Sequence, residues 1–306
     1  MAGKKLKGLI ITMRPKIGIV TFPWVAAMAL FASVLYGDFS SPIHSDSNFY
    51  ITFLLIMLGS YLGVTSGYAV NDYFDAELDT ASPIDKAVKH GIPKKALLSY
   101  AAILGIPSLV ILLYLSIYTG IVGIIQMLCI LVYSKSMKGK VAYSNMFVVL
   151  PTALMPMGVF FVYTDQFTIE ALLLFITYFF FEPGFTWSGV CRDTEHDKKR
   201  GVPTLSVKYG IKGVAKFILM CWILVLVMSV VLFLFTNLGL IFLIGSSFAA
   251  VLLIGLAINL IKNPHPKTAA STFIKSAGWF WFFSFSVIID VVLRIAGIVL
   301  PGVNLP

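Results

Sequence analysis

The chain has 306 residues, of which 58% are hydrophobic and only 12% charged, and its formal net charge is +9. So few charged residues could not cover the surface of a soluble globular domain, and this class of protein is excluded. The basic residues are spread over several short segments, which argues against a nucleic-acid partner. We therefore expect an integral membrane protein.

Nine apolar stretches of helical length follow one another along the chain. A helix of about 20 apolar residues crosses the roughly 30 Å hydrocarbon core of a bilayer. The expected spans are 16–36, 49–70, 95–115, 118–133, 144–163, 168–190, 211–235, 238–261 and 272–300. The sequence predicts an all-α bundle of nine transmembrane helices, forming one polytopic domain over residues 1–306.

The basic residues predict how the spans are oriented. All Lys and Arg residues except Arg294 lie in or beside alternate connecting segments, whereas segments such as 37–48 and 164–167 contain none. Lys and Arg concentrate in short loops on the cytoplasmic side. We expect a cytoplasmic N-terminus and an outer C-terminus, in a multi-pass protein of a prokaryotic plasma (inner) membrane.

The first acidic cluster follows the second span, at residues 71–79. A helix advances by about 100° per residue, so Asn71, Asp72, Asp75 and Asp79 share one face, with Glu77 on the opposite side. This spacing places three carboxylates and one amide together at the cytoplasmic end of the span.

The second acidic cluster follows the sixth span. Asp193 and Asp197 are four residues apart and share a helix face, also at the cytoplasmic end. Like charges at this density are unfavourable unless cations neutralise them, and oxygen ligands suit Mg²⁺ together with substrate phosphates. Solvated helix ends are the structural alternative, but two clusters on one membrane face favour a metal site. Its predicted ligands are Asp72, Asp75, Asp79, Asp193 and Asp197.

With these two motifs, the sequence resembles the UbiA superfamily of intramembrane prenyltransferases. That family has nine transmembrane helices, an NDxxDxxxD motif after the second and a DxxxD motif after the sixth. Residues 71–79 fit the first motif and residues 193–197 fit the second. The resemblance implies a prenyltransferase with an intramembrane substrate cavity and a cytoplasmic active-site face.

The resemblance also implies the reaction and its partners. The expected reaction is Mg²⁺-dependent transfer of an isoprenyl group, with Mn²⁺ able to substitute, from a polyprenyl diphosphate to a lipophilic acceptor. The acceptor could be a quinone precursor, an isoprenoid or a glycerol lipid. The five aspartates are then the catalytic and metal-binding residues. We expect the bilayer, the donor and the acceptor as partners, with no nucleic acid and no obligate protein partner.

Other residues resemble the family more loosely. Arg14 and Pro15 are similar to its Arg-Pro start, and Tyr133 with Lys138 is similar to a Tyr and Lys after its fourth span. Residues 80–86 depart from the family, because they lack its arginines, and Lys86 is a local substitute. The expected substrate-binding residues are Asn71, Tyr68, Tyr133, Lys138, Lys135, Arg14, Lys86 and Glu182.

Ionisable groups inside spans usually mark function. Glu182 would lie on the face of Asp193 and Asp197, about 16 Å deeper than Asp193, where either contact with the acceptor or a structural role is expected. Asp290 and Arg294 are four residues apart and predict an intrahelical ion pair. The aromatic run 178–181 could border a prenyl chain or face lipid.

Two other functions use the same features. A terpene cyclase of this superfamily would ionise the same diphosphate and close the chain on itself without an acceptor. A cation-coupled transporter could bind ions at the acidic clusters. The clusters lie at one membrane face, whereas transporter sites usually lie near the midplane, so transfer is the leading interpretation.

Overall fold

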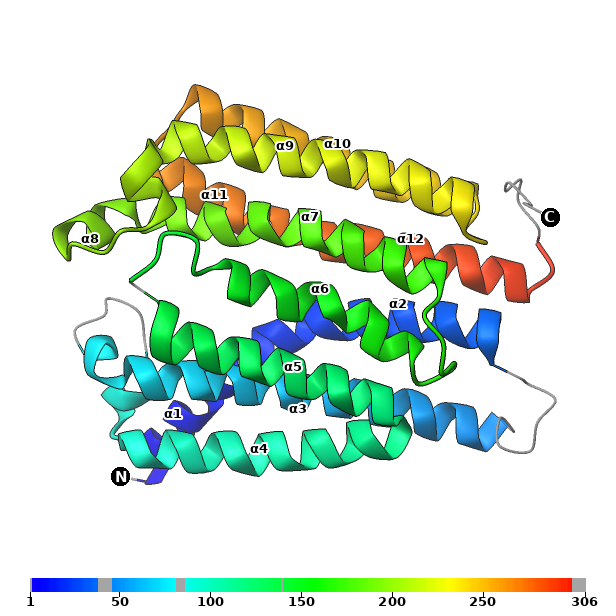
Figure 1. Cartoon of the computed structure of the whole chain (residues 1–306), viewed down its shortest axis with the longest axis horizontal. Coiled ribbons are helices and arrows are strands. Elements are labelled where there is room, and N and C mark those ends of the chain that lie inside the picture. Colours follow the sequence, from blue (N-terminus) through cyan, green and yellow to red (C-terminus); the bar gives the residue numbers. More distant parts are fainter. Residues whose placement is uncertain (1, 38–45, 81–85, 139, 299–306) are drawn as a thin grey trace.

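The computed structural model describes residues 2–37, 46–80, 86–138 and 140–298, and every regular element within these ranges is a helix (Figure 1). The first elements are α1 (Ala2–Met13), α2 (Pro15–Tyr36), α3 (Asp46–Asp79), η2 (Ala87–His90), α4 (Lys94–Leu115), α5 (Ile117–Val132) and η3 (Tyr133–Met137). The later ones are α6 (Met146–Phe160), α7 (Ile169–Arg192), α8 (Thr194–Lys199), α9 (Leu205–Phe235), α10 (Leu240–Lys262), α11 (Pro266–Ser276) and α12 (Gly278–Ile295). The long helices lie side by side along the long axis of the molecule.

The apolar helices confirm a multi-pass membrane protein but not the count of nine spans. By length and composition, eight helical segments in the described ranges can cross a membrane. The expected fifth span, 144–163, contains only α6, a 15-residue helix with Pro151 and Pro156 inside it. This helix is shorter than the roughly 20 residues that a span needs. The ninth span and the cytoplasmic N-terminus remain predictions.

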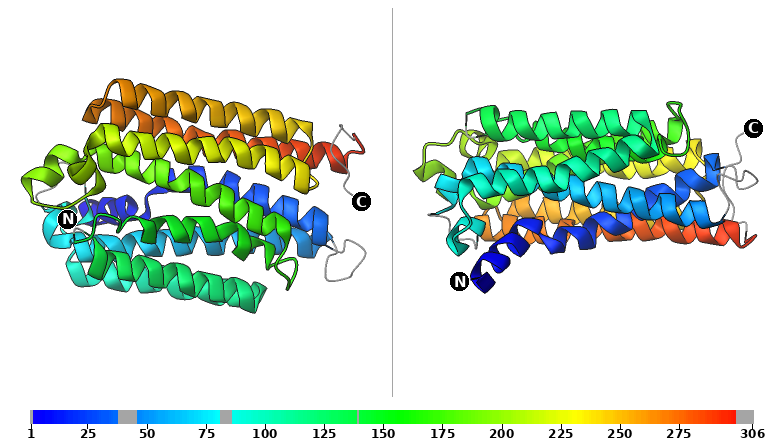
Figure 2. Two further views of the ribbon diagram at one scale, coloured as in Figure 1. Left: turned by 45° about the horizontal axis from the view of Figure 1, so that its top comes forward. Right: turned by 90° about the horizontal axis from the view of Figure 1, so that it is seen from below.

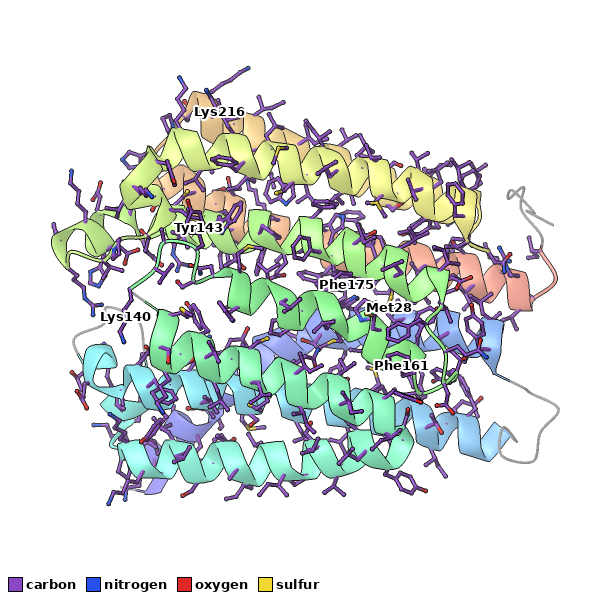
Figure 3. The ribbon with its side chains drawn as sticks, viewed as in Figure 1. Met28, Lys140, Tyr143, Phe161, Phe175 and Lys216 are labelled. Atoms are coloured by element: carbon purple, nitrogen blue, oxygen red, sulfur yellow. The ribbon has the colours of Figure 1, made fainter. Side chains whose placement is uncertain are left out.

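Helices that follow one another in the chain are neighbours in space, and contact between α12 and α2 closes the series (Figure 2). Because α2 also contacts α6, it divides the bundle into two halves. One half contains α7, α9, α10 and α12, and the other contains α3, α4 and α5. Figure 3 shows Lys140 towards the end of the bundle where α8 lies. Met28, Phe161 and Phe175 lie further along the bundle, among the long apolar helices.

The half with α7 and α12 has a packed aromatic core. The Tyr178 ring lies 4.4 Å from that of Trp24 and 5.3 Å from that of Trp279, and Phe181 stacks on Trp279 at 4.1 Å between ring centres. Tyr178 and Phe181 are fully buried. The expectation that the run 178–181 borders a prenyl chain or faces lipid is therefore wrong for these two residues, because other rings of the core surround them.

The half with α3 and α4 is built on small residues that let the two helices approach closely. A Cβ added to Gly63 would lie 2.9 Å from the Ser108 hydroxyl, and one added to Gly105 would lie 2.6 Å from that of Ser66. Ser108 also donates a hydrogen bond of 2.7 Å to the carbonyl of Gly59. Small residues and hydroxyls at helix contacts are typical of packing in membranes.

Asp290 caps a neighbouring helix, and the predicted ion pair with Arg294 is absent from the ion pairs of the described ranges. Its carboxylate accepts hydrogen bonds from the backbone N–H groups of Gly239 (2.7 Å) and Phe242 (3.3 Å), at the start of α10. The first N–H groups of a helix have no partner within it, and leaving them unpaired in hydrocarbon is costly. Asp290 therefore pairs with the unpaired N–H groups at the start of α10 and not with Arg294.

We expect Asp290→Ala to destabilise the protein by about 1–3 kcal/mol, because two buried N–H donors lose their acceptor. The measurement is thermal unfolding in detergent, followed by tryptophan fluorescence. Arg294→Gln is the control and should leave the unfolding temperature near that of the wild type. Equal losses in both variants would support the intrahelical ion pair instead.

Candidate active site

The first acidic motif lies on the last turns of α3. The helix continues through it to Asp79, nine residues beyond the expected end of the span. Asp72 and Asp75 are buried, with 3% and 7% of their surface exposed, and Asn71 donates a hydrogen bond of 3.0 Å from Nδ2 to Asp75. The side chain of Asp79 lies outside the described residues. Buried carboxylates require partners, and basic side chains supply them.

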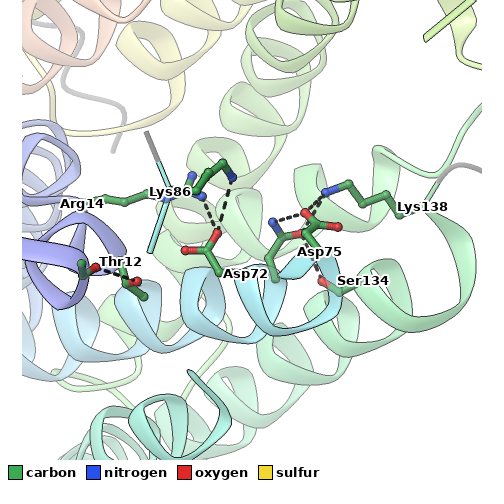
Figure 4. A network of polar contacts seen from close by, with 9 residues as sticks. Thr12, Arg14, Asp72, Asp75, Lys86, Ser134 and Lys138 are labelled. Carbon is green, nitrogen blue, oxygen red and sulfur yellow. Dashed lines mark hydrogen bonds and ion pairs between the residues drawn. The ribbon is translucent and has the colours of Figure 1, made fainter. Parts of the chain in front are cut away.

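Asp72 is held by two basic side chains from different segments (Figure 4). Arg14 Nη2 lies 3.0 Å from its carboxylate and Lys86 Nζ lies 3.7 Å from it. Arg14 joins α1 to α2 with φ of 46°, a left-handed conformation that strains residues other than glycine. Its guanidinium also lies 4.1 Å from the centre of the Tyr68 ring. Three predicted substrate-binding residues therefore meet at Asp72.

Asp75 contacts Lys138, whose Nζ also lies 3.4 Å from Asn71 Oδ1. Lys138 follows η3, a π-helical turn in which its backbone N–H donates to the carbonyl of Tyr133 at 2.9 Å. Such wider turns are rare and are frequent at functional sites. Here the turn ends at the lysine that contacts the motif.

Two other residues of η3 correct the sequence interpretation. Ser134 is buried and donates to Asn71 Oδ1 at 3.4 Å, a contact that no sequence signal indicated. Lys135 is exposed, and within the described ranges no hydrogen bond or ion pair joins it to the motif. The π-helical turn explains why Ser134 and not Lys135 contacts the motif, because the wider turn changes which side chains point towards α3.

The second motif does not form one uninterrupted helix face. Helix α7 ends at Arg192, and Asp193 stands at the junction with α8, which contains Asp197. Arg192 Nε and Nη2 donate to both oxygens of Asp193, at 2.8 and 2.7 Å. Arg192 was not among the predicted site residues. Burial, together with the neighbouring charge of Asp193, raises the pKa of Asp197. A bound cation would relieve this repulsion.

Tyr133 connects the two motifs. It interacts electrostatically with both Asp75 and Asp197, and Lys138 Nζ lies 5.8 Å from the centre of its ring. Asp75 belongs to α3, and Asp197 belongs to the segment after α7. Both motifs therefore lie near this tyrosine, although Asp75 and Asp193 are 118 positions apart in the chain.

A cavity of about 730 Å³ continues from the motif into the bundle between α3, α4, α5 and α6. Asn71, Tyr133 and Lys138 line its polar end, and most of its wall is apolar. The lining extends along α3 from Asn71 to Ile56, a length of about 22 Å at 1.5 Å per residue. Ile106, whose side chain is exposed on the surface of the bundle, also belongs to the wall. The shape suits a long apolar chain with a charged head.

Glu182 lies in α7, ten residues before the end of the helix. The expected common face with Asp193 and Asp197 requires one continuous helix, and α7 ends at Arg192, before both aspartates. Glu182 is 5% exposed and accepts a hydrogen bond of 3.0 Å from Thr186. Thr186 lines the cavity, and no motif in the sequence indicated it.

The chemistry of the donor groups fits a magnesium ion. They are carboxylate and amide oxygens, which Mg²⁺ prefers. Within the described ranges, no group of three or more His, Cys, Asp or Glu side chains could hold a metal ion alone. Mg²⁺ commonly binds one or two carboxylates and completes its shell with substrate phosphates and water. The pair Asp72 and Asp75 supplies this number of carboxylates.

Comparison with known proteins adds a family match. The model of the UbiA prenyltransferase family matches residues 23–286. The chain is 29% identical over 192 residues to protoheme IX farnesyltransferase 1 of Bacillus subtilis, covering 61% of this chain and 60% of that protein, less than two thirds of its length. It is 26% identical over 241 residues to digeranylgeranylglyceryl phosphate synthase of Methanosphaera stadtmanae, covering 76% and 87%.

Solved structures show the same fold. A structure of digeranylgeranylglyceryl phosphate synthase in membranes matches with a TM-score of 0.71 at 23% identity, over 94% of this chain and 99% of that chain. A UbiA homologue from Archaeoglobus fulgidus, bound to GPP and Mg²⁺, matches with a TM-score of 0.57 at 16% identity, over 94% and 99%. At these identities the likeness concerns the fold.

Proposed function

Because the chain belongs to the UbiA prenyltransferase family, we propose that this prenyltransferase transfers an isoprenyl group from a polyprenyl diphosphate to a lipophilic acceptor in the membrane. The observation that carries the proposal is the junction of the apolar cavity with a buried, charged site at Asp72, Asp75 and Lys138. A diphosphate fits the charged end, and a prenyl chain fits the cavity. The proposed enzyme is one domain over residues 1–306.

The basic side chains around the motif are suited to a diphosphate. Arg14 and Lys86 pair with Asp72, and Lys138 pairs with Asp75. A divalent cation held by these carboxylates would stabilise the negative charge that the leaving diphosphate gains as the allylic C–O bond breaks. Arg14, Lys86 and Lys138 can then turn to phosphate oxygens without leaving the site. Each stabilises charge where it develops.

The relatives support the donor class and the metal. Two are named as a farnesyltransferase and a digeranylgeranylglyceryl phosphate synthase, and the Archaeoglobus homologue holds GPP and Mg²⁺. We propose Mg²⁺ as the cofactor of this chain, with Mn²⁺ able to substitute. The site lies at the membrane face that carries the basic segments, which we propose to be the cytoplasmic face of a prokaryotic plasma membrane.

The test is incubation of the purified protein, in lipid vesicles, with labelled prenyl diphosphates of several lengths, with and without a membrane lipid extract. A prenylated lipid that forms only with the extract is expected. A cyclic hydrocarbon formed without any acceptor would identify a cyclase. Ion flux across the vesicle membrane without any new product would identify a transporter.

We expect Gly123→Leu to impair the use of long prenyl diphosphates. Gly123 lines the cavity ten residues before Tyr133, about 15 Å deeper along α5, and an added Cβ would approach only the end of the flexible Leu112 side chain, at 2.9 Å. Leu112 can shift, and the new side chain occupies cavity space. Displacing four buried carbons of the prenyl chain costs about 3 kcal/mol, roughly 100-fold in kcat/KM.

The measurement compares kcat/KM for a long donor with that for the five-carbon donor, which should change little. Gly255→Leu is the matched control, since Gly255 in α10 is exposed and an added Cβ meets no atom within 4 Å. If Gly123→Leu lowered kcat/KM equally for both donors, the cavity would not be the site of the prenyl chain.

A further inference from the structure

Glu182 is a buried carboxyl that the diphosphate site does not use. Within the described residues, its one hydrogen bond comes from the Thr186 hydroxyl, which lies 3.0 Å from Glu182 Oε1. Thr186 is one helical turn closer to the motif and lines the cavity. The pair therefore joins a buried carboxyl to the space where substrates meet. Ionisable groups at membrane depth usually serve function.

The depth of this pair matches that of the reacting carbon. Tyr68 lies four residues below Asp72 on α3, about 6 Å deeper. Tyr68 lines the cavity and interacts electrostatically with Arg14, Glu182 and Asp72. Glu182 lies ten residues before the end of α7 and Tyr68 eleven before the end of α3, and both helices end on the same side of the bundle (Figure 1). The two side chains therefore lie at a similar depth, just below the carboxylates. With a diphosphate at Asp72 and its chain in the cavity, the allylic carbon lies at this level.

Prenyl transfer to a heteroatom releases a proton, and a base near the allylic carbon is needed to receive it. Asp72, Asp75 and Asp193 of the two motifs are already engaged by Arg14, Lys86, Lys138 and Arg192. Glu182 makes no such ion pair within the described ranges. It is a buried carboxyl that reaches the cavity through Thr186, and its Oε1 is placed to receive a proton from that hydroxyl.

We propose that Thr186 and Glu182 form the proton-accepting pair of the transfer, and that the acceptor carries a hydroxyl group. This proposal rests on the proposed function. The allylic C–O bond breaks and the diphosphate leaves with the electron pair, while the acceptor oxygen forms a new C–O bond to the allylic carbon. The acceptor proton passes to Thr186 Oγ1, and the Thr186 proton passes to Glu182 Oε1. The products are an ether, diphosphate and a protonated Glu182.

The hydroxyl of the acceptor follows from the chemistry of Thr186. The lone pairs of Oγ1 accept a hydrogen bond from an O–H group and orient its oxygen. A ring or alkene carbon offers no such group. The acceptor class is therefore an alcohol or phenol with an apolar body, and the bond formed is an ether.

The variants are Glu182→Gln and Thr186→Val, each close in shape to the wild-type residue. Gln can still accept the hydrogen bond from Thr186, but it cannot take up a proton. Acceptor-dependent turnover should fall by about 100-fold or more in either variant, the scale of general base catalysis. Because the residues act as one unit, the double variant should be little worse than either single variant.

A second readout separates proton transfer from a structural role. In the absence of acceptor, slow hydrolysis of the prenyl diphosphate reports donor binding and ionisation, and it should persist in both variants with an unchanged KM for the donor. Glu170→Gln is the matched control. Glu170 is a second buried carboxyl of α7, held by the Tyr36 hydroxyl at 2.6 Å near the opposite end of the helix. The Glu170→Gln variant should transfer the prenyl group to the acceptor at the wild-type rate.

Wild-type transfer by Glu182→Gln would overturn the proton-accepting pair and leave the proposed function standing. Equal loss of hydrolysis and transfer would also overturn the pair, by placing Glu182 in the donor site or in the fold. If the wild-type protein transferred its prenyl group to no alcohol or phenol but did prenylate a carbon acceptor, the hydroxyl class would be wrong. Absence of any transfer by the wild type would overturn the proposed function itself.

Discussion

Replacing Asp75 by Asn should lower turnover by at least about 100-fold, the scale lost when a group that stabilises charge in the transition state is removed. Asp75 is buried and contacts Lys138 and Asn71. Asn keeps the shape of the side chain but removes the charge that holds a metal ion and orients the lysine. Asp197→Asn should cause a comparable loss from the second motif.

The measurement is steady-state turnover with a labelled prenyl diphosphate in vesicles, beside the thermal unfolding temperature of each variant. Glu77→Gln is the control on the same helix. Glu77 is exposed and pairs with Lys94 at 2.8 Å at the surface, and exposed pairs contribute little. Its turnover and stability should stay near those of the wild type. Comparable activity in all three variants would refute the assignment of the aspartates.

Removal of divalent cations should abolish transfer. Carboxylate and diphosphate oxygens are hard ligands, which favour Mg²⁺ and Mn²⁺, and without a cation the leaving diphosphate lacks its main charge stabilisation. The experiment adds EDTA to the vesicle assay and then restores either metal in excess. Activity should fall to background and return with each of them.

EDTA saturated with Mg²⁺ beforehand is the control for effects of the chelator on the vesicles, and it should leave turnover unchanged. Thermal unfolding in EDTA should also change little, because the buried carboxylates have basic partners within the protein in Arg14, Lys86 and Lys138. Full turnover in free EDTA would rule out the proposed chemistry.

The inner face of α3 could be predicted because it depends on local geometry. The angle between successive side chains of a helix is fixed, so the spacing of Asn71, Asp72 and Asp75 places them together whatever surrounds the helix. The structure agrees, since the Asn71 side chain donates a hydrogen bond to Asp75 across one helical turn. The same argument misjudged Asp193, because the helix was assumed to continue and α7 ends at Arg192.

Partners from distant segments could not be predicted with the same certainty. Arg14 is 58 residues from Asp72, and Lys138 is 63 residues from Asp75. The family resemblance suggested both, but it also suggested Lys135, which lies exposed. The π-helical turn at Tyr133–Met137 selects between the lysines. Its extra residue is a property of how the chain packs after α5.

The sequence by itself determined the class of this protein and the face that carries its charges. Long apolar stretches dictate membrane helices because the bilayer satisfies no backbone hydrogen bonds, and helix periodicity dictates the acidic face. Tertiary structure alone decided that Tyr178 and Phe181 fill a core, that Asp290 caps α10, and that Thr186 joins Glu182 to the cavity. Such contacts depend on which helices pack side by side, and the spacing of residues along one helix carries no record of its neighbours.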